Sequence, residues 1–328
     1  MKRTNISIFI PHIGCPHKCS FCDQRTISGA QKPPTAADVT ALLEEQAPSL
    51  KKRGMTAEIA FFGGSFTAIP RGYMTEMLEA ANRAVKRFEC YSGIRCSTRP
   101  DCVSADVLEL LSSYGVTAIE LGAQSMSDEV LKANERGHTA EDVRRAAELI
   151  KKSGIELGLQ MMTGLFRDTP DNCRYTADEF IKLKPAAVRV YPTVILKNTR
   201  LGERFESGEY ETFSFDETVD LCAELLRKFE REKIRVIRLG LHASGDIERD
   251  MLGGVYHPAL REVVESRVFF KDMREMLSGR EKGHYLVFTD PRNISKAVGQ
   301  KKCNIKALAE LGYEIDILPL DGEYLAIK

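Results

Sequence analysis

Hydrophobic positions along the chain form short apolar runs that alternate with longer stretches of helical spacing. Residues 6–10 are an apolar run that Pro11 ends, and they predict a first buried strand. Further apolar runs predict strands at 58–62, 93–97, 116–121, 155–162 and 186–192. Helical spacing predicts helices at 36–50, 73–88, 104–113, 140–153, 171–183 and 215–232. Six strand–helix units imply an α/β fold: a parallel sheet with right-handed crossovers that forms an open or partial (β/α)6 TIM-like barrel. Functional side chains then belong at the C-terminal strand ends.

The pattern changes after residue 255. Residues 256–277 have helical spacing and predict a connector. The remainder predicts the order strand, helix, loop, helix, strand, strand, at 285–288, 290–298, 299–302, 304–311, 313–317 and 324–327. We therefore expect a barrel over residues 1–255, a helical connector over 256–280 and a small α+β domain over 281–328.

Composition narrows the class of protein. Lys and Arg together number 47, as do Asp and Glu, so the overall charge gives no argument for nucleic acid or membrane. No apolar run approaches the roughly 20 residues that cross a bilayer. The nine cysteines are odd in number and show no regular pairing, which suits a reducing compartment. Together with the lack of a signal-like start, this predicts a cytoplasmic enzyme with no membrane partner.

Three cysteines after the first strand carry the most specific chemistry. Cys15, Cys19 and Cys22, here called the cysteine triad, have the spacing C-x-x-x-C-x-x-C. Three thiolates on one short loop can hold three irons of a [4Fe–4S] cluster and leave the fourth iron open. A four-cysteine zinc site would need a fourth ligand nearby, and the next cysteine, Cys90, is far downstream. The alternative is a chance group of structural or zinc-binding cysteines.

The triad, with Phe21 directly before its third cysteine, resembles the hallmark of the radical SAM superfamily. The resemblance implies that S-adenosylmethionine binds the open iron beside Phe21. One electron, from a reductant such as flavodoxin or ferredoxin, would then cleave it to a 5′-deoxyadenosyl radical that takes a hydrogen atom from the substrate. The cofactors implied are a [4Fe–4S] cluster and S-adenosyl-L-methionine.

Two predicted strands end in residues suited to binding this cofactor. Gly63, Gly64 and Ser65 follow the second strand, and glycines let a backbone approach a ligand closely. The resemblance implies that this segment meets the amino group of S-adenosylmethionine, although a plain glycine turn is the alternative. Ser97 and Arg99, at the end of the third strand, have groups that bind ribose or carboxylate oxygens. An ordinary turn remains open there too.

Two later segments are more specific in combination. The sequence G-A-Q-S, containing Gln124, and the sequence R-G-H-T, beginning at Arg136, resemble one branch of the superfamily. That branch contains the Elongator catalytic subunit and the oxygen-independent coproporphyrinogen oxidases. It implies that Gln124 and Arg136 contact S-adenosylmethionine. Gln160 holds the matching polar position on the fifth strand and is a candidate for the cofactor ribose, although the porphyrin enzymes have Asp there.

The sixth strand separates the two kinds of enzyme in this branch. Residues 188–195, V-R-V-Y-P-T-V-I, resemble the Elongator segment K-I-Y-P-T-L-V-I. The resemblance implies a structured RNA substrate, tRNA first, with Arg189 and Tyr191 as candidates for contact with it. Two departures matter. The first two cysteines are closer together here, and we expect no acetyltransferase domain, so acetyl transfer is not implied.

The C-terminal segment resembles a small KH domain of the NusA type, most closely over residues 294–301. A KH loop, Gly-x-x-Gly, clamps the nucleic-acid backbone. Here Lys302 replaces its last glycine, within a positive stretch. Lys296, Gly299, Lys301 and Lys302 are therefore candidates for RNA contact. The alternative is a solvated helical hairpin that packs on the barrel.

The sequence thus predicts a radical SAM enzyme that modifies tRNA or another structured RNA. Two alternatives stay open: a radical SAM enzyme of tetrapyrrole or haem chemistry, and a non-catalytic iron–sulfur RNA-binding regulator.

Overall fold

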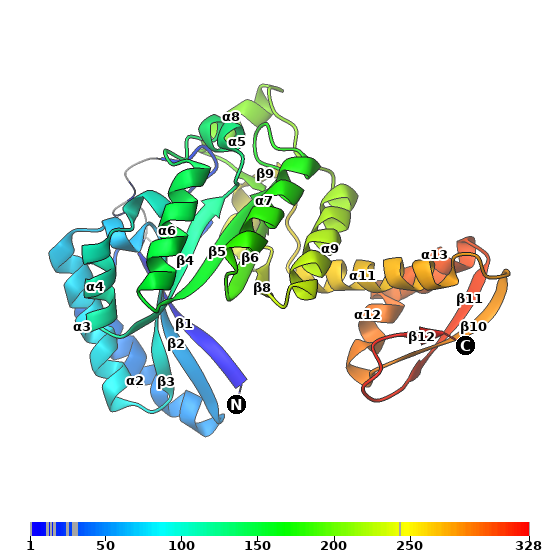
Figure 1. Ribbon diagram of the computed structural model, residues 1–328, viewed down its shortest axis with the longest axis horizontal. Helices are drawn as coiled ribbons and strands as arrows, with labels where there is room; N and C mark the ends of the chain where they lie inside the picture. The colour runs from blue at the N-terminus through cyan, green and yellow to red at the C-terminus, as the bar shows by residue number, and fades with distance from the viewer. Residues whose placement is uncertain are drawn as a thin grey trace.

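A curled parallel sheet forms the body of the protein. The structure is a computed structural model that describes residues 2–10, 13, 15, 18–23, 26–27, 32–242 and 244–327. Within these ranges a seven-stranded sheet has the order β1-β2-β3-β4-β5-β6-β8 and curls into a half-barrel (Figure 1). Its strands are β1 (Lys2–Ile10), β2 (Met55–Gly63), β3 (Tyr91–Thr98), β4 (Val116–Gln124), β5 (Glu156–Thr163), β6 (Ala187–Pro192) and β8 (Arg235–Leu239). Because all neighbours are parallel, the strands end at one edge of the sheet.

Helices cover the outer face of the sheet (Figure 1). They are α2 (Ala36–Lys52), α3 (Arg71–Arg87), α4 (Ala105–Ser113), α6 (Ala140–Lys152), α7 (Pro170–Leu183) and α9 (Phe215–Arg231). Helix α6 shows the local cause: Thr139 and Asp142 form a capping box at its start, and Val143, Ala147 and Ile150 then recur on its buried face. The alternation of strands and helices predicted from the sequence is confirmed.

The structure has elements that the apolar pattern did not predict. Strand β8 extends the sheet by one strand beyond the expected six, with the short sequence R-V-I-R-L. An antiparallel pair, β7 (Val194–Leu196) with β9 (Met251–Gly254), forms a separate two-stranded sheet. The short helices α5 (Asp128–Ala133), α8 (Arg200–Glu206) and α10 (Gly245–Asp250) were also missed. All are too short for a periodic signal to stand out.

The C-terminal part is a small α+β module, as expected. It contains β10 (Gly283–Thr289), α12 (Ile294–Val298), α13 (Cys303–Glu310), β11 (Tyr313–Pro319) and β12 (Ala326–Ile327). The strand order is β11-β10-β12, with β10 parallel to β11 and antiparallel to β12. The predicted order of strands and helices is therefore confirmed.

Helix α11 (Leu260–Leu277) joins the two parts and contributes to both cores (Figure 1). Its first half, with Val264 and Val268, packs in the barrel core. Its second half, with Phe269 and Met273, packs in the separate core of the module. The two cores thus meet within one continuous helix, which makes α11 part of both units and more than a spacer.

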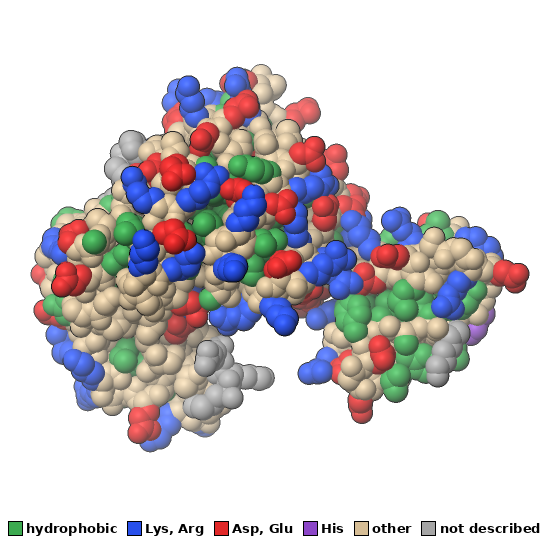
Figure 2. All heavy atoms as spheres, viewed as in Figure 1, with side chains coloured by type: hydrophobic (Ala, Val, Ile, Leu, Met, Phe, Trp, Pro, Cys, Tyr) green, Lys and Arg blue, Asp and Glu red, His purple; other side chains and the backbone are tan. Residues whose placement is uncertain are grey.

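The surface agrees with the balanced composition. Basic and acidic side chains are interspersed over the barrel on the face shown in Figure 2. Among the helices that the structure describes, none is both long and apolar enough to span a bilayer.

Candidate active site

The cysteine triad and the strand-end residues line one cavity. Its volume is about 130 Å³, and all three cysteines reach it. Eight of the nine residues predicted to bind the cofactor line it as well: Phe21, Gly63, Gly64, Ser97, Arg99, Gln124, Arg136 and Gln160. Segments up to 145 residues apart in the chain therefore meet at the C-terminal edge of the sheet, where the parallel topology places them.

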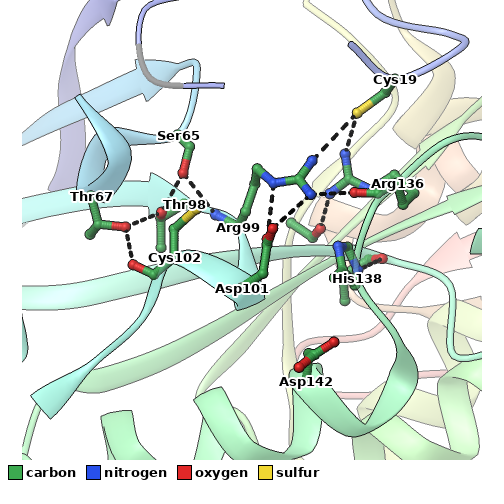
Figure 3. Close-up of polar contacts among 12 residues, drawn as sticks. Cys19, Ser65, Thr67, Thr98, Arg99, Asp101, Cys102, Arg136, His138 and Asp142 are labelled. Atoms are coloured by element: carbon green, nitrogen blue, oxygen red, sulfur yellow. Dashed lines mark hydrogen bonds and ion pairs between the residues drawn. The ribbon is translucent and has the colours of Figure 1, made fainter. Parts of the chain in front are cut away.

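Ser65, the ninth residue, does not line the cavity but contacts two residues that do, Thr98 and Arg99. It is buried, and its hydroxyl is 2.8 Å from that of Thr98 and accepts a hydrogen bond from the backbone N–H of Arg99 at 3.3 Å (Figure 3). Its contacts hold the end of β3 against the turn after β2.

The three cysteines share a cavity without forming a site for a single ion. Within the described ranges, no group of three or more His, Cys, Asp or Glu side chains is placed to hold one metal ion. A cubane needs no such group, because each of its thiolate ligands binds a different iron. Burial raises the pKa of the Cys15 thiol, while Arg99 and Arg136 act in the opposite direction. Binding to iron would release that proton.

Two arginines face the central cysteine of the triad (Figure 3). The Nη1 atom of Arg136 donates to Cys19 Sγ at 2.9 Å, and Nη1 of Arg99 lies 3.8 Å from the same sulfur. Arg99 is itself held by Asp101, through Nε–Oδ1 and Nη2–Oδ2 contacts of 2.9 and 3.0 Å. The carboxylate that pairs with Arg99 thus lies two residues later in the same turn, and the Nη1 atom of Arg99 faces the sulfur of Cys19.

Arg136 and Gln124 carry buried polar atoms that lack partners. Arg136 is 5 % exposed, its Nη2 donates to the carbonyl oxygen of Gly122, and its guanidinium lies 5.8 Å from the ring of Phe21. Among the described residues, neither Arg136 Nε nor Gln124 Oε1 has a hydrogen-bond partner. Gln124 also has φ 67°, a left-handed conformation that is rare away from glycine. Unpaired buried polar atoms at a cavity fit a polar ligand, and S-adenosylmethionine is one.

The paired glycines bring the cysteine loop close to β2. A Cβ at Gly64 would lie 2.9 Å from the carbonyl oxygen of Ile13 and 3.4 Å from Cys15 Sγ. A Cβ at Gly63, whose φ is +109°, would lie 2.7 Å from the carbonyl oxygen of Ile10. Only glycine permits both approaches. These residues thus determine how closely the loop that carries the triad approaches the sheet.

A second cavity of about 450 Å³ adjoins the first. The two share lining residues, among them Phe21, Cys22, Gln124 and Gln160. Aromatic side chains of Phe9, Phe62 and Tyr191 also line the larger cavity. Arg189 and Tyr191, predicted to contact RNA, therefore lie inside the barrel beside the cysteine cavity.

A buried carboxylate organises the floor of these cavities. Glu120 is 1 % exposed and accepts from Arg189 Nη2 at 2.8 Å, from Arg95 Nη1 at 3.1 Å and from Gln160 Nε2 at 2.9 Å. Gln160 also donates to Ser97 Oγ at 3.2 Å. Burial alone would raise the pKa of Glu120, but Arg189 and Arg95 hold it below its ordinary value. The sequence showed that Glu120 needs a partner, but not that Arg189 supplies it.

Two basic residues of the larger cavity, Arg238 and His242, were not among the predicted site residues. Arg238 lies on the unpredicted strand β8, and His242 follows it. His242 was expected to be an isolated structural histidine. Burial and the charge of Arg238 lower its pKa, and its ring stacks on Phe9 with centroids 6.3 Å apart.

The candidate RNA-binding loop lies in the C-terminal module, on the turn between α12 and α13. Gly299, Lys301 and Lys302 have φ values of 77°, 51° and 61°, so Lys302 keeps a left-handed backbone where a KH loop has glycine. In the described part of the chain neither lysine has an ion-pair partner, whereas Lys296 Nζ lies 3.0 Å from Glu265 Oε2. Asn304 secures the turn by donating to the carbonyl oxygen of Ala297 at 3.0 Å.

Known proteins share this architecture. A model of the radical SAM superfamily matches residues 9–180, just over half of the chain, and one of the Radical_SAM C-terminal domain matches residues 185–269. Human Elongator complex protein 3 is 28% identical over 70% of this chain and 46% of its own length. The tRNA uridine(34) acetyltransferase of Methanocaldococcus infernus is 26% identical over 85% of this chain and 60% of its own length. The chain thus spans about half the length of these relatives.

A solved structure agrees at the level of the fold. The Elp3 of Methanocaldococcus infernus superposes with a TM-score of 0.63 at 20% identity, over 85% of this chain and 64% of that one. The superfamily model, which covers residues 9–180, includes the cysteine triad and the strand ends that line its cavity. The chain therefore belongs to the radical SAM superfamily of enzymes.

Proposed function

We propose that this enzyme binds a [4Fe–4S] cluster and S-adenosylmethionine and uses them to modify tRNA or another structured RNA. The observation that carries the proposal is the convergence of the triad with Gly64, Gln124, Arg136 and Gln160 on one cavity. The unpaired Gln124 Oε1 and Arg136 Nε support a polar ligand there.

In this proposal the triad holds the cluster, and the strand ends hold S-adenosylmethionine. When bound, the two supply hydrogen-atom abstraction driven by one electron, which a reductant such as flavodoxin or ferredoxin would provide. Arg136 and Arg99 face the sulfur of Cys19 and offset the negative charge of a thiolate ligand. Gln160 is fixed by Glu120 and Ser97, so its amide is preorganised toward the cavity.

The larger cavity is the proposed substrate site. It adjoins the cysteine cavity through shared lining residues, so a group bound there would meet the reactive centre. The aromatic side chains of Phe9, Phe62 and Tyr191 suit a planar base taken out of its stack. The naming of one relative as a tRNA uridine(34) acetyltransferase supports tRNA as the first substrate to test.

The C-terminal module is the proposed site of contact with the RNA backbone. Lys301 and Lys302 project from a turn with left-handed backbone, and within the described ranges no acidic side chain pairs with them. The overall charge is balanced, so RNA affinity must come from local sites such as this one.

Mass analysis of nucleosides from a deletion strain tests the proposed function. We expect one modified nucleoside to disappear from tRNA, and to return with the wild-type chain. A matched pair of variants sharpens the result: Cys22→Ala removes a triad cysteine, whereas Cys90→Ala removes a half-buried cysteine outside the cavity. Only Cys90→Ala should restore the nucleoside.

Two other outcomes would point elsewhere. An unchanged nucleoside profile with accumulation of a porphyrin precursor would favour tetrapyrrole chemistry and contradict the RNA substrate. Failure of the reduced enzyme to cleave S-adenosylmethionine would favour a non-catalytic iron–sulfur regulator.

A further inference from the structure

The described side chains that line the larger cavity carry positive charge and no negative charge. Arg189 on β6 and Arg238 on β8 are register partners on neighbouring strands, and both line the cavity together with His242. None of the described residues that line this cavity is Asp or Glu. Two guanidinium groups thus face one cavity, and the partners of each guanidinium determine the net charge of its lining.

Glu120 balances the charge of Arg189. Arg189 makes a two-point contact with the buried carboxylate of Glu120, with Nη2 to Oε1 at 2.8 Å and Nε to Oε2. Its guanidinium also lies 5.0 Å from the ring centroid of Phe62. Arg189 is therefore held in place and its charge is balanced before any ligand arrives.

Arg238 has no such partner. Its Nε donates to the carbonyl oxygen of Gly240 at 2.9 Å, which fixes the plane of the guanidinium. In the described part of the chain, neither terminal nitrogen has a hydrogen-bond or ion-pair partner. His242 does not balance the charge, because a neutral or protonated imidazole carries no negative charge. The cavity therefore keeps one positive charge with four free N–H donors.

We propose that Arg238 binds an anionic group of the substrate, a phosphate or a carboxylate. A guanidinium whose two terminal nitrogens are free matches the two oxygens of either group. Arg238 lines the larger cavity and not the cysteine cavity, so the anionic group would bind away from the reactive centre. This inference rests on the proposed function in taking the larger cavity as the substrate site.

The aromatic walls make the expected substrate more specific. Phe9, stacked on His242 beside Arg238, and Phe62, its register partner on the neighbouring strand β2, form an aromatic wall that suits a planar group. A nucleotide with its flanking phosphate has both features, a planar base and a neighbouring anion. A small aromatic or unsaturated carboxylate has the same chemistry, so the test must separate these two sources.

The first arm of the test compares two variants by tRNA binding over a salt series. Arg238→Gln removes the free guanidinium. The control Arg235→Gln makes the same change on the same strand, at an exposed residue that lies 3.5 Å from Glu156 and outside the cavity. If the anion is an RNA phosphate, Arg238→Gln should weaken binding roughly ten- to hundredfold. It should also lower the salt slope by about 0.7–0.9, as expected for one lost phosphate contact.

The second arm uses the wild-type chain and needs no variant to fold. Phenylglyoxal reacts with free guanidinium groups, and peptide mass analysis gives its rate at Arg238. The rate is measured alone and with tRNA, inorganic phosphate or acetate at a matched concentration of negative charge. Protection by tRNA alone identifies a backbone phosphate, whereas protection by acetate or phosphate identifies a small anionic substrate.

The outcomes separate this inference from the proposed function. If tRNA does not bind but acetate or phosphate protects Arg238, the RNA substrate fails and the anion site stands. If tRNA binds, both variants bind it equally and no probe protects Arg238, the anion site is overturned while an RNA substrate survives.

Discussion

Replacing Glu120 by glutamine tests the charge network beneath the two cavities. Glutamine keeps the size of the side chain but removes its charge. It leaves Arg189 and Arg95 without their shared buried carboxylate, and it points amide N–H donors at guanidinium donors. Gln160 also loses the carboxylate that fixes its amide.

The magnitude follows from burial. Glu120 is 1 % exposed, and removing one partner of a buried ion pair costs about 3–5 kcal/mol, because a desolvated charge is left unpaired. The total stability of a domain is about 5–15 kcal/mol, so the loss is a large fraction of it. Glu224→Gln is the control: Glu224 has the same two-point geometry with Arg174, at 2.8 and 2.9 Å, but these side chains are 44% and 39% exposed. Its loss should be about 0–1 kcal/mol.

Urea unfolding at neutral pH measures both losses from the shift in midpoint. The pH dependence adds a second test with a defined sign. Arg189 and Arg95 depress the pKa of Glu120 in the folded chain, so its contribution is complete above its ordinary pKa of 4.5. The contribution is lost as the pH falls through the folded value, and the difference between wild type and Glu120→Gln should shrink there. Equal losses for the two variants at neutral pH would refute the role of the buried network.

Three further predictions concern the cofactor, the RNA and a buried histidine. Arg136→Ala should weaken binding of S-adenosylmethionine roughly ten- to hundredfold by calorimetry, since it removes a contact worth about 1.5–3 kcal/mol. The iron content should stay unchanged. Unchanged affinity would contradict the role of Arg136 in binding the cofactor. Lys301→Gln with Lys302→Gln should lower tRNA affinity about equally across sequences and reduce the salt slope by about one to two, measured by filter binding. An unchanged slope would leave the loop as a packing element. Burial and Arg136 lower the pKa of His138 to about 4, so the unfolded chain binds the extra proton first as the pH falls below about 6.5. Stability should therefore fall from pH 6.5 toward 4, and His138→Phe should flatten this slope in urea titrations; an unchanged slope would contradict the assignment.

The sequence predicted the residues of the site better than their contacts. The family resemblance selected Gln124 and Arg136. Because strand ends in a parallel sheet meet at one edge, these residues and Gln160 were expected near the triad, and they line its cavity. Contacts depend on partners distant in the chain. Glu120 was expected to need a partner, but nothing in a linear pattern points to Arg189, 69 residues later. Arg189 was accordingly taken only as a candidate for RNA contact.

Strand β8 shows the limit of the apolar pattern. Its five residues, R-V-I-R-L, include two arginines, so no apolar run marks it. As a result Arg238, which lies across from Arg189, could not be placed at the site. Helix α11 shows a second limit: its apolar positions predict a helix, but not that one half packs on the barrel and the other on the module.

The most direct test of the account combines iron content with cofactor cleavage after anaerobic reconstitution. The wild-type chain should bind close to four irons, as one [4Fe–4S] cluster does, and cleave S-adenosylmethionine to 5′-deoxyadenosine when reduced. The variant with all three triad cysteines replaced by alanine should do neither, whereas Cys90→Ala should behave as the wild type does. Full cluster content and cofactor cleavage in the triple variant would contradict the central claim, because the iron would then be held elsewhere in the chain.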